Sequence, residues 1–466
     1  MIKYKICLFI LFISCQVFGQ KDTATLNVEQ VLEIVKNYHP VVKQGNINIE
    51  KSKASITIAR GAFNPIIGNY LTNKTFDNTK YYDYINPNIT LPTWFGVEIS
   101  AGLENLSGNR FDPSETLGQT SYLGANIPLL KNLLMDKRRA YLKQSKVYNN
   151  MAITEQQVLI NNILMDAAAQ YWEWVNTFKA FEIAEKNLVL SKKRFEFIKR
   201  TFQNGDHSAI DTIEAQSQFQ NFEIQKNESW LKFQNAGLEL SAFLWQTNNT
   251  PYELPKYVVP QNGWDNEKNI QNFSIREEEL LASAQQFHPE LQIYKQKLNV
   301  FEINKKLKFQ ELLPKLDFRY NHLSKGYNVL SNEMMPFQNN YQYALKLEMP
   351  LLFSQGRGEF KIAKLKIEEI KIAQSQKTLL VAVKVKSYFN EFQTLRNQVL
   401  LQRSMLNNFE KLLKAEETLF QNGESSLFLI NSRENKVFEA ERKLIELKTK
   451  YYKTIYALQW SAGLLK

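Results

Sequence analysis

The sequence predicts a mainly α-helical chain with a β-barrel portion, in which duplicated long helical hairpins accompany about four transmembrane strands per chain. Three observations lead to this fold class. Short motifs recur in the same order in the two halves of the chain, long segments without Gly or Pro show helical periodicity, and other segments alternate apolar and polar residues as strands do. The barrel is expected to close only in an oligomer.

Residues 1–19 are expected to be a cleaved signal peptide, because two lysines precede an apolar run and small residues end at Gly19. The run is shorter than the roughly 18 apolar residues of a spanning helix. As a minor alternative, Cys15 is lipidated and becomes the mature N-terminus. Cys7 and Cys15 are the two cysteines of the sequence, so cleavage leaves no thiol for a disulfide, a metal site or nucleophilic catalysis.

The formal net charge of +11 is spread along the chain, where Lys and Arg alternate with Glu. This pattern predicts solvated helix faces and disfavours a nucleic-acid site. Every long stretch after residue 20 is interrupted by charges. Any membrane crossing is therefore expected to use strands, whose backbone groups are satisfied in a closed barrel.

Recurring motifs predict an internal duplication. The matched pairs are His39-Pro40 with His288-Pro289, Pro65 with Pro314, Ile127-Pro128-Leu129-Leu130 with Met349-Pro350-Leu351-Leu352, and Phe202-Gln203-Asn204-Gly205 with Phe420-Gln421-Asn422-Gly423. Capping boxes are expected where the first helix of each half begins, at Asn27 with Gln30 and at Ser274 with Glu277. The first repeat is placed at 20–250, a connecting segment at 251–273 and the second repeat at 274–466.

Two segments without Gly or Pro, 129–204 and 359–422, predict very long helices, roughly 115 and 95 Å if fully helical. Apolar residues recur at steps of four and three, as in a coiled-coil seam, at Ile160, Leu164, Ala167, Tyr171, Trp174, Phe178 and Phe181. Gln402 and Glu416 interrupt the second seam. Each long helix ends at Asn-Gly and a second helix runs back, so helical hairpins are expected at 132–247 and 353–465.

Strands are expected within 65–129 and 315–350, where apolar residues alternate with polar ones. The principal strands are placed near 65–75, 119–129, 315–323 and 341–350. A soluble sandwich would show the same alternation. About four strands are too few for a membrane barrel, which needs at least eight, whereas three copies would give about twelve. The longer insertion at 76–118 is expected to add a hairpin at the outer rim.

The chain resembles the TolC family of outer-membrane efflux channels. The resemblance lies in the duplication, in the strand pairs closed by Pro-Leu-Leu, in the Gly turns between long helices, and in the order of these features. The resemblance covers essentially the whole mature chain. It implies a homotrimer in the outer membrane of a Gram-negative-type bacterium, with a β-barrel in the lipid and a periplasmic α-helical tunnel. Its tip would meet a periplasmic adaptor (membrane fusion) protein and an inner-membrane transporter. The implied function is passive conduction for efflux or type I secretion.

The same resemblance implies candidate pore residues. In better-known members, acidic residues six and nine positions after the turn glycine constrict the tunnel, and here these positions are Asp211 and Glu214. Because they share one helix face, they either line the pore as a carboxylate ring or lie on a solvated helix surface. In the second half the offsets fall on Leu429 and Ser432, which depart from the family's acidic pair.

The two turns between the helices are the expected adaptor-docking tip. Its candidate residues are Gly205, Asp206, Gly423 and Glu424. A plain helix cap is compatible with the same residues, since a docking surface there needs the turn first.

An enzyme is not expected. The four histidines, His39, His207, His288 and His322, show no metal-ligand spacing, and no Gly-rich phosphate loop is present, so no catalytic site, metal or cofactor is predicted. His39 and His288, each before a proline, are expected to be turn or packing residues. The alternative function is an exported coiled-coil structural or adhesive protein without a channel, which would not require the duplicated strand pairs. The sequence does not specify the cargo.

Overall fold

A computed structural model describes residues 24–109, 116–205, 208–328 and 336–466. The chain is mainly helical with one large sheet, as predicted. It divides into two compact units. The sheet unit comprises Lys36–Asp166, Ser274–Thr394 and Thr454–Lys466, and the helical unit comprises the residues up to Val35, Ala167–Phe273 and Leu395–Lys453. The expected signal peptide 1–19, with Cys15, lies outside the described residues.

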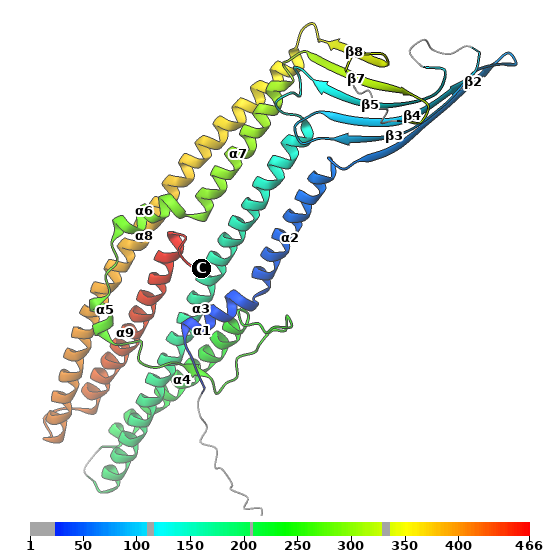
Figure 1. The fold of residues 1–466 in the computed structure, drawn as a ribbon. Coiled ribbons are helices and arrows are strands. Elements are labelled where there is room, and N and C mark those ends of the chain that lie inside the picture. Colours follow the sequence, from blue (N-terminus) through cyan, green and yellow to red (C-terminus); the bar gives the residue numbers. More distant parts are fainter. Residues whose placement is uncertain (1–23, 110–115, 206–207, 329–335) are drawn as a thin grey trace, which may run out of the picture. The chain divides into compact units, whose positions relative to one another are not determined.

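The sheet unit holds a six-stranded antiparallel sheet in the order β2-β3-β4-β5-β7-β8 (Figure 1). Its strands are β2 (Ile66–Phe76), β3 (Thr79–Pro92), β4 (Glu98–Ser107), β5 (Gly118–Pro128), β7 (Lys315–Lys325) and β8 (Tyr341–Glu348). Outside this sheet, β1 (Thr25–Leu26) pairs in parallel with β6 (Val259–Pro260) in the helical unit.

The sheet corrects the prediction of about four strands, because the insertion at 76–118 forms β3 and β4 between β2 and β5. The insertion therefore adds two strands to the sheet itself. Asp77 and Asn78, with φ of 49° and 59°, form the two-residue turn that leads from β2 into β3. Positive φ at both positions matches the twist of the flanking strands, and Asp and Asn tolerate this conformation without glycine.

The helices include two very long ones, α3 (Lys137–Gln203) and α8 (Ser354–Gln421), which together with α9 (Leu427–Ser461) contribute residues to both units. The others are α1 (Val28–Tyr38), α2 (Pro40–Gly61), α4 (Ala209–Ser241), α5 (Glu267–Asn272), α6 (Glu277–Phe287) and α7 (Pro289–Gln310). No helix among the described residues combines the length and the apolar character that a membrane span requires.

The predicted seam of α3 is largely buried, with Leu164, Ala167, Tyr171 and Trp174 at most 2% exposed. The polar residues that interrupt the α8 seam are used for contacts. Gln402 Nε2 donates to the backbone carbonyl of Ala440 on α9 at 3.1 Å, and Glu416 accepts from the Ser425 hydroxyl at 2.5 Å. Both polar side chains are thus paired, the buried Gln402 and the partly buried Glu416.

One of the two predicted capping boxes is present. The Asn27 and Gln30 side chains each accept from the other's backbone N–H, at 2.8 and 3.0 Å, where α1 begins. The prediction at Ser274 was wrong, because α6 begins at Glu277 after Arg276, whose side chain makes no cap bond. Three glutamates in the first turn of α6 favour this start through the helix dipole.

His39 and His288 are N-cap residues, in line with the predicted turn role. In each case Nδ1 accepts a backbone N–H at 3.2 Å, from Val41 and from Glu290, and a proline occupies the first helical position. This bond needs a neutral imidazole at Nδ1. Burial lowers the pKa of both histidines, which favours the same neutral form.

We expect mild acid to destabilise the sheet unit through His288. Its folded-state pKa lies below the ordinary value of 6.5, so the unfolded chain takes up the proton first. The stabilisation is therefore complete above that value and is lost as the pH falls below it. Replacing His288 with Asn retains a cap acceptor, and the thermal midpoint of this variant should fall less than that of the wild type between about pH 7.5 and 5.5.

His322→Asn is the matched control, since it removes a histidine from strand β7 without touching a helix cap. It should keep the pH response of the wild type. An identical pH response in His288→Asn and in the wild type would contradict the assignment.

Candidate functional site

The six-stranded sheet has one apolar face and one polar face, which the strand register defines. Cross-strand rows on the apolar face run Ile67–Ile89–Ala101–Leu123–His322–Tyr341 and Leu91–Ile99–Ala125–Tyr320–Tyr343. Large side chains on this face are uncovered, such as Ile67, which is 84% exposed, and Leu347, which is 67% exposed. An uncovered apolar sheet face of this extent marks an interaction surface.

The opposite face is polar. Its rows run Thr90–Ser100–Gly124–Asn321–Gln342 and Glu98–Asn126–Arg319–Ala344. On this face the Glu104 carboxylate accepts from the Tyr84 hydroxyl at 3.1 Å and from the Thr120 hydroxyl at 3.0 Å. A sheet that is apolar on one side and polar on the other can separate lipid from water.

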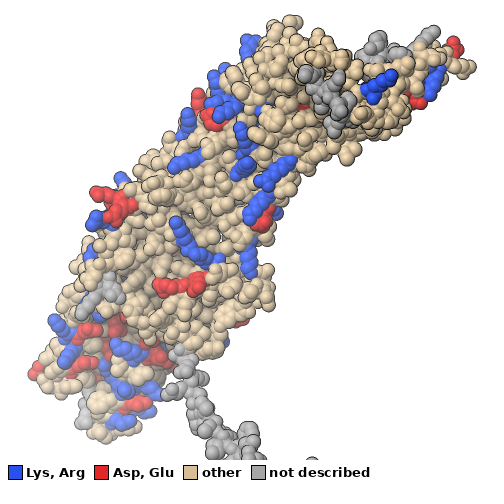
Figure 2. Space-filling view, viewed as in Figure 1, with Lys and Arg blue, Asp and Glu red and all other residues tan. Residues whose placement is uncertain are grey.

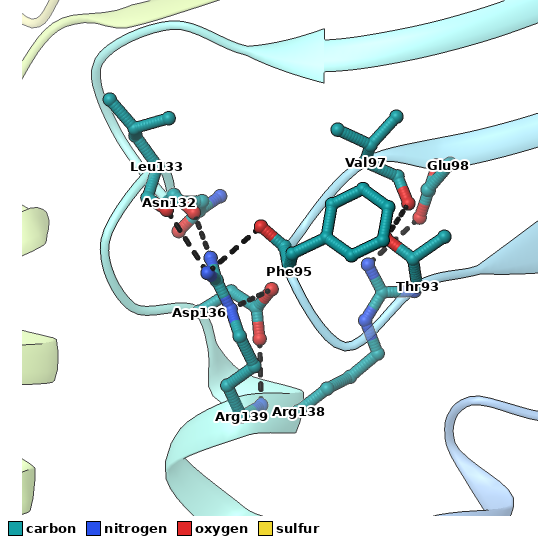
Figure 3. A network of polar contacts seen from close by, with 9 residues as sticks. All are labelled: Thr93, Phe95, Val97, Glu98, Asn132, Leu133, Asp136, Arg138 and Arg139. Carbon is teal, nitrogen blue, oxygen red and sulfur yellow. Dashed lines mark hydrogen bonds and ion pairs between the residues drawn. The ribbon is translucent and has the colours of Figure 1, made fainter.

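Arg139, in the first turn of α3, ties the β3–β4 turn to the end of β5 (Figure 3). Its Nη1 donates to the carbonyls of Phe95 at 3.2 Å and Leu133 at 3.0 Å, and its Nη2 donates to the carbonyl of Asn132. Its Nε donates to Asp136 at 3.1 Å. The planar guanidinium therefore satisfies carbonyls of two separate turns at once.

Asp136 also accepts the backbone N–H of Arg139 at 2.8 Å, so it caps the start of α3. On the other side, Gly96 has φ of +100°, and a Cβ there would lie 2.8 Å from the Arg139 guanidinium. Glycine is needed at position 96 both for the backbone conformation and for this close approach. Arg138 adds an ion pair to Glu98, at the start of β4, at 2.9 Å.

In the helical unit, both predicted turns carry glycine in the left-handed region. Gly205 has φ of +86° and Gly423 has φ of +79°. After α8, the Gly423 N–H donates to the backbone carbonyl of Phe420 at 3.0 Å, and the Glu424 N–H donates to the backbone carbonyl of Leu419 at 2.8 Å. This pair of bonds is a Schellman motif, which ends the helix. Asp206 lies outside the described residues.

Asp211 and Glu214 both take part in local contacts. Asp211 completes a capping box with Ser208, whose backbone N–H and hydroxyl it accepts at 3.1 and 2.8 Å. Glu214 accepts from Asn431 Nδ2 on α9 at 3.2 Å. Both carboxylates therefore help to hold the start of α4, and whether they also line a pore stays a prediction.

Arg194 of α3 joins α8 and α9 near these turns. Its Nη1 lies 2.5 Å from Glu434 Oε2, and its Nη2 lies 3.5 Å from Glu417 Oε1. Glu434 is only 6% exposed. Burial raises the pKa of Glu434 although the Arg194 charge opposes this shift. A second ion pair joins Arg433 to Glu416 at 3.5 Å.

Apolar clusters complete this end of the helical unit. Ala184 packs with Phe222 and Phe438, and Ile198 packs with Ala215 and Leu427, so side chains of α3, α4 and α9 meet. On the face seen in Figure 2, charged side chains of both signs gather over the helical unit and are sparse over the sheet. Among the described residues, no group of three or more potential metal ligands lies together.

Comparison with known proteins agrees with this geometry. The family model for outer membrane efflux proteins matches residues 280–464. The solved structure of CusC is similar over 94% of this chain and 92% of its own, with a TM-score of 0.66 and 13% identity. The CmeC outer membrane channel of Campylobacter jejuni gives a TM-score of 0.65, 13% identity, and coverage of 94% and 86%.

The outer membrane protein VceC of Vibrio cholerae is also similar, with a TM-score of 0.62, 12% identity, and coverage of 94% of this chain and 96% of that one. A search of curated proteins finds no match. At these identities the structural likeness establishes the fold, while the match at 280–464 rests on sequence. Together they confirm the predicted family resemblance.

Proposed function

We propose that this chain, which matches the outer membrane efflux protein family over residues 280–464 and shares the fold of outer-membrane channels, is a subunit of such a channel. It conducts substrate passively across the outer membrane. The observation that carries the proposal is the sheet with one uncovered apolar face and one polar face, because a membrane wall requires this arrangement. A peripheral coiled-coil or adhesive protein would have no use for it.

One chain has too few strands for a membrane barrel, which needs at least eight. Within the described residues β2 pairs only with β3, and β8 pairs only with β7, so the sheet has two free edges. A symmetric oligomer joins such edges and removes them. The family resemblance supports a homotrimer as this oligomer, with a periplasmic adaptor and an inner-membrane transporter as its proposed partners.

The helical hairpins supply the tunnel and its tip in this proposal. Gly205 and Gly423 form the turns that an adaptor would meet, together with Asp206 and Glu424. Asp211 and Glu214, close to the first turn, are the candidate constriction. The energy for transport comes from the inner-membrane transporter. Either efflux of small compounds or type I secretion fits the architecture.

We expect the purified protein to be a detergent-extracted trimer that forms channels in planar bilayers. Replacing Asp211 with Asn and Glu214 with Gln should lower the cation-over-anion permeability ratio severalfold, because a ring of carboxylates would be lost. The amides retain acceptors for Ser208 and Asn431, so the local bonds survive. Reversal potentials in a salt gradient give the ratio.

Glu223→Gln is the matched control, an exposed glutamate on the same helix. It should leave the permeability ratio unchanged. An unaltered ratio in the double variant would place Asp211 and Glu214 on the solvated surface instead. A protein that alkaline carbonate releases from membranes, and that forms no channel, would reject the channel and favour the coiled-coil alternative.

A further inference from the structure

The β3–β4 hairpin continues the two-faced sheet without interruption. The apolar rows pass through Ile89 and Leu91 of β3 and through Ile99 and Ala101 of β4. A polar row passes through Thr90 and Ser100 and continues into β5 at Gly124, although its partner in β2 is Ile66. The register continues the apolar row into Ile67 of β2 and Leu123 of β5. Strands outside the membrane need no apolar face toward lipid, so this alternation in register with the neighbouring strands favours a position in the membrane wall.

Strand length supports the same conclusion. β3 has 14 residues and β4 has 10. A tilted strand crosses the hydrocarbon core with about 9 to 11 residues, so both can span it.

The turn between these strands has the character of a membrane interface. Trp94 is 76% exposed and Phe95 is 50% exposed, and their rings meet edge to face at 5.4 Å. Aromatic girdles of this kind flank the apolar band of membrane barrels. Arg139 fixes this turn to the start of α3, so the hairpin is anchored at the helix-bearing end of the sheet (Figure 3).

From these observations we infer that β3 and β4 are full wall strands, and that three copies close an eighteen-stranded barrel through β2 of one copy and β8 of the next. The inference rests on the proposed trimeric channel. An inserted pair keeps the number of strands even, so β2 and β8 still meet antiparallel. Barrels with 16 to 18 strands leave an aqueous channel, so the narrowest point lies elsewhere, in the helical part.

Cysteine labelling in the full mature protein tests this inference, since Cys7 and Cys15 both lie in the expected leader. Single cysteines replace Ile89 and Ala101 on the apolar face and Thr90 and Ser100 on the polar face. In reconstituted vesicles, a membrane-impermeant maleimide should label the apolar-face positions at least about tenfold more slowly than the polar-face positions. Nitroxide labels at Ile89 and Ala101 should be accessible to oxygen in the lipid.

Tyr343→Cys and Gln342→Cys in β8 are the reference pair, one on each face. If all four β3–β4 positions label rapidly while this pair still differs, the hairpin lies outside the wall and the inference fails, although a conducting trimer would leave the proposed function standing. If the reference pair does not differ and no conductance appears, the proposed function itself fails.

Disulfide formation offers an independent measurement of the wall. Ile67→Cys in β2 is combined in turn with Tyr341→Cys, Tyr343→Cys or Leu345→Cys, which lie on the same face of β8. At least one combination should give disulfide-linked dimers and trimers. The β2–β8 link is expected in a barrel of either size, because it uses the free edge of β2. In a twelve-stranded barrel without β3 and β4, the other edge of β2 would meet β5, so Ile67→Cys would also form an intrachain bond with Leu123→Cys or Ala125→Cys, and this result would overturn the inference.

Discussion

Replacing Arg139 with Ala is expected to lower the free energy of unfolding of the sheet unit by about 3 to 5 kcal/mol, because several charge-assisted hydrogen bonds are lost at once. The guanidinium serves the carbonyls of Phe95, Leu133 and Asn132 and the carboxylate of Asp136. Both Arg139 and Asp136 have side chains only 12% exposed, so water would replace these bonds poorly. The β3–β4 turn would then lose its attachment to α3.

The fraction of heat-resistant trimer on denaturing gels and the urea midpoint both report this effect. Arg139→Lys should recover only part of the loss, since a lysine has no planar fork to bridge separate carbonyls. Arg138→Ala is the matched control on the adjacent residue, whose side chain is 30% exposed and which makes one ion pair to Glu98. Arg138→Ala should lower the free energy of unfolding by about 1 kcal/mol or less. An equal loss of stability in Arg138→Ala and Arg139→Ala would contradict the claim that Arg139 in particular attaches the β3–β4 turn to α3.

Much of the fold could be predicted from the sequence, because the positions of Gly and Pro and the alternation of apolar and polar residues determine where its long helices and outer strands lie. The absence of Gly and Pro allowed the long helices, and period-two alternation bounded by Pro65 and Pro128 placed the outer strands of the first half within about two residues of β2 and β5. The inserted strands were missed as wall strands. Pro87 lies inside β3, where a proline argues against a strand in the middle of a sheet, and the turn at Asp77-Asn78 lacks the glycine that usually marks a two-residue hairpin.

Contacts of the candidate site could be predicted from the sequence only where the two residues lie within a few positions of each other along the chain. The Ser208-to-Asp211 spacing is itself a capping-box pattern, so the structural duty of Asp211 could have been read from the sequence. The clamp of Arg139 depends on a turn more than 40 residues earlier in the chain. Glu434 and Arg194 are farther apart still, and only the packing of α3 against α9 brings them together. No local spacing rule encodes such pairs.

The buried pair of Arg194 and Glu434 gives the second large effect that we expect. Replacing Glu434 with Ala leaves the Arg194 charge, whose side chain is 19% exposed, with only Glu417 at 3.5 Å. Removing one partner of a buried ion pair costs about 3 to 5 kcal/mol, because the remaining charge is left uncompensated. The urea midpoint of the helical unit should fall accordingly, and channel conductance should rise as α3 and α9 separate.

A double variant distinguishes an ion pair from simple packing. Arg194→Met combined with Glu434→Leu replaces both charges with apolar side chains of similar size, and such replacements are often neutral or stabilising. Its stability should therefore return close to that of the wild type, although Glu434→Leu and Arg194→Met are each destabilising alone. The comparison pair is Lys186 and Glu441, where the lysine side chain is 62% exposed, so removing Glu441 should cost about 1 kcal/mol or less. Losses that simply add in the double variant would show that Arg194 and Glu434 act independently, and a wild-type stability for Glu434→Ala would show that α9 is held to α3 by its apolar contacts alone.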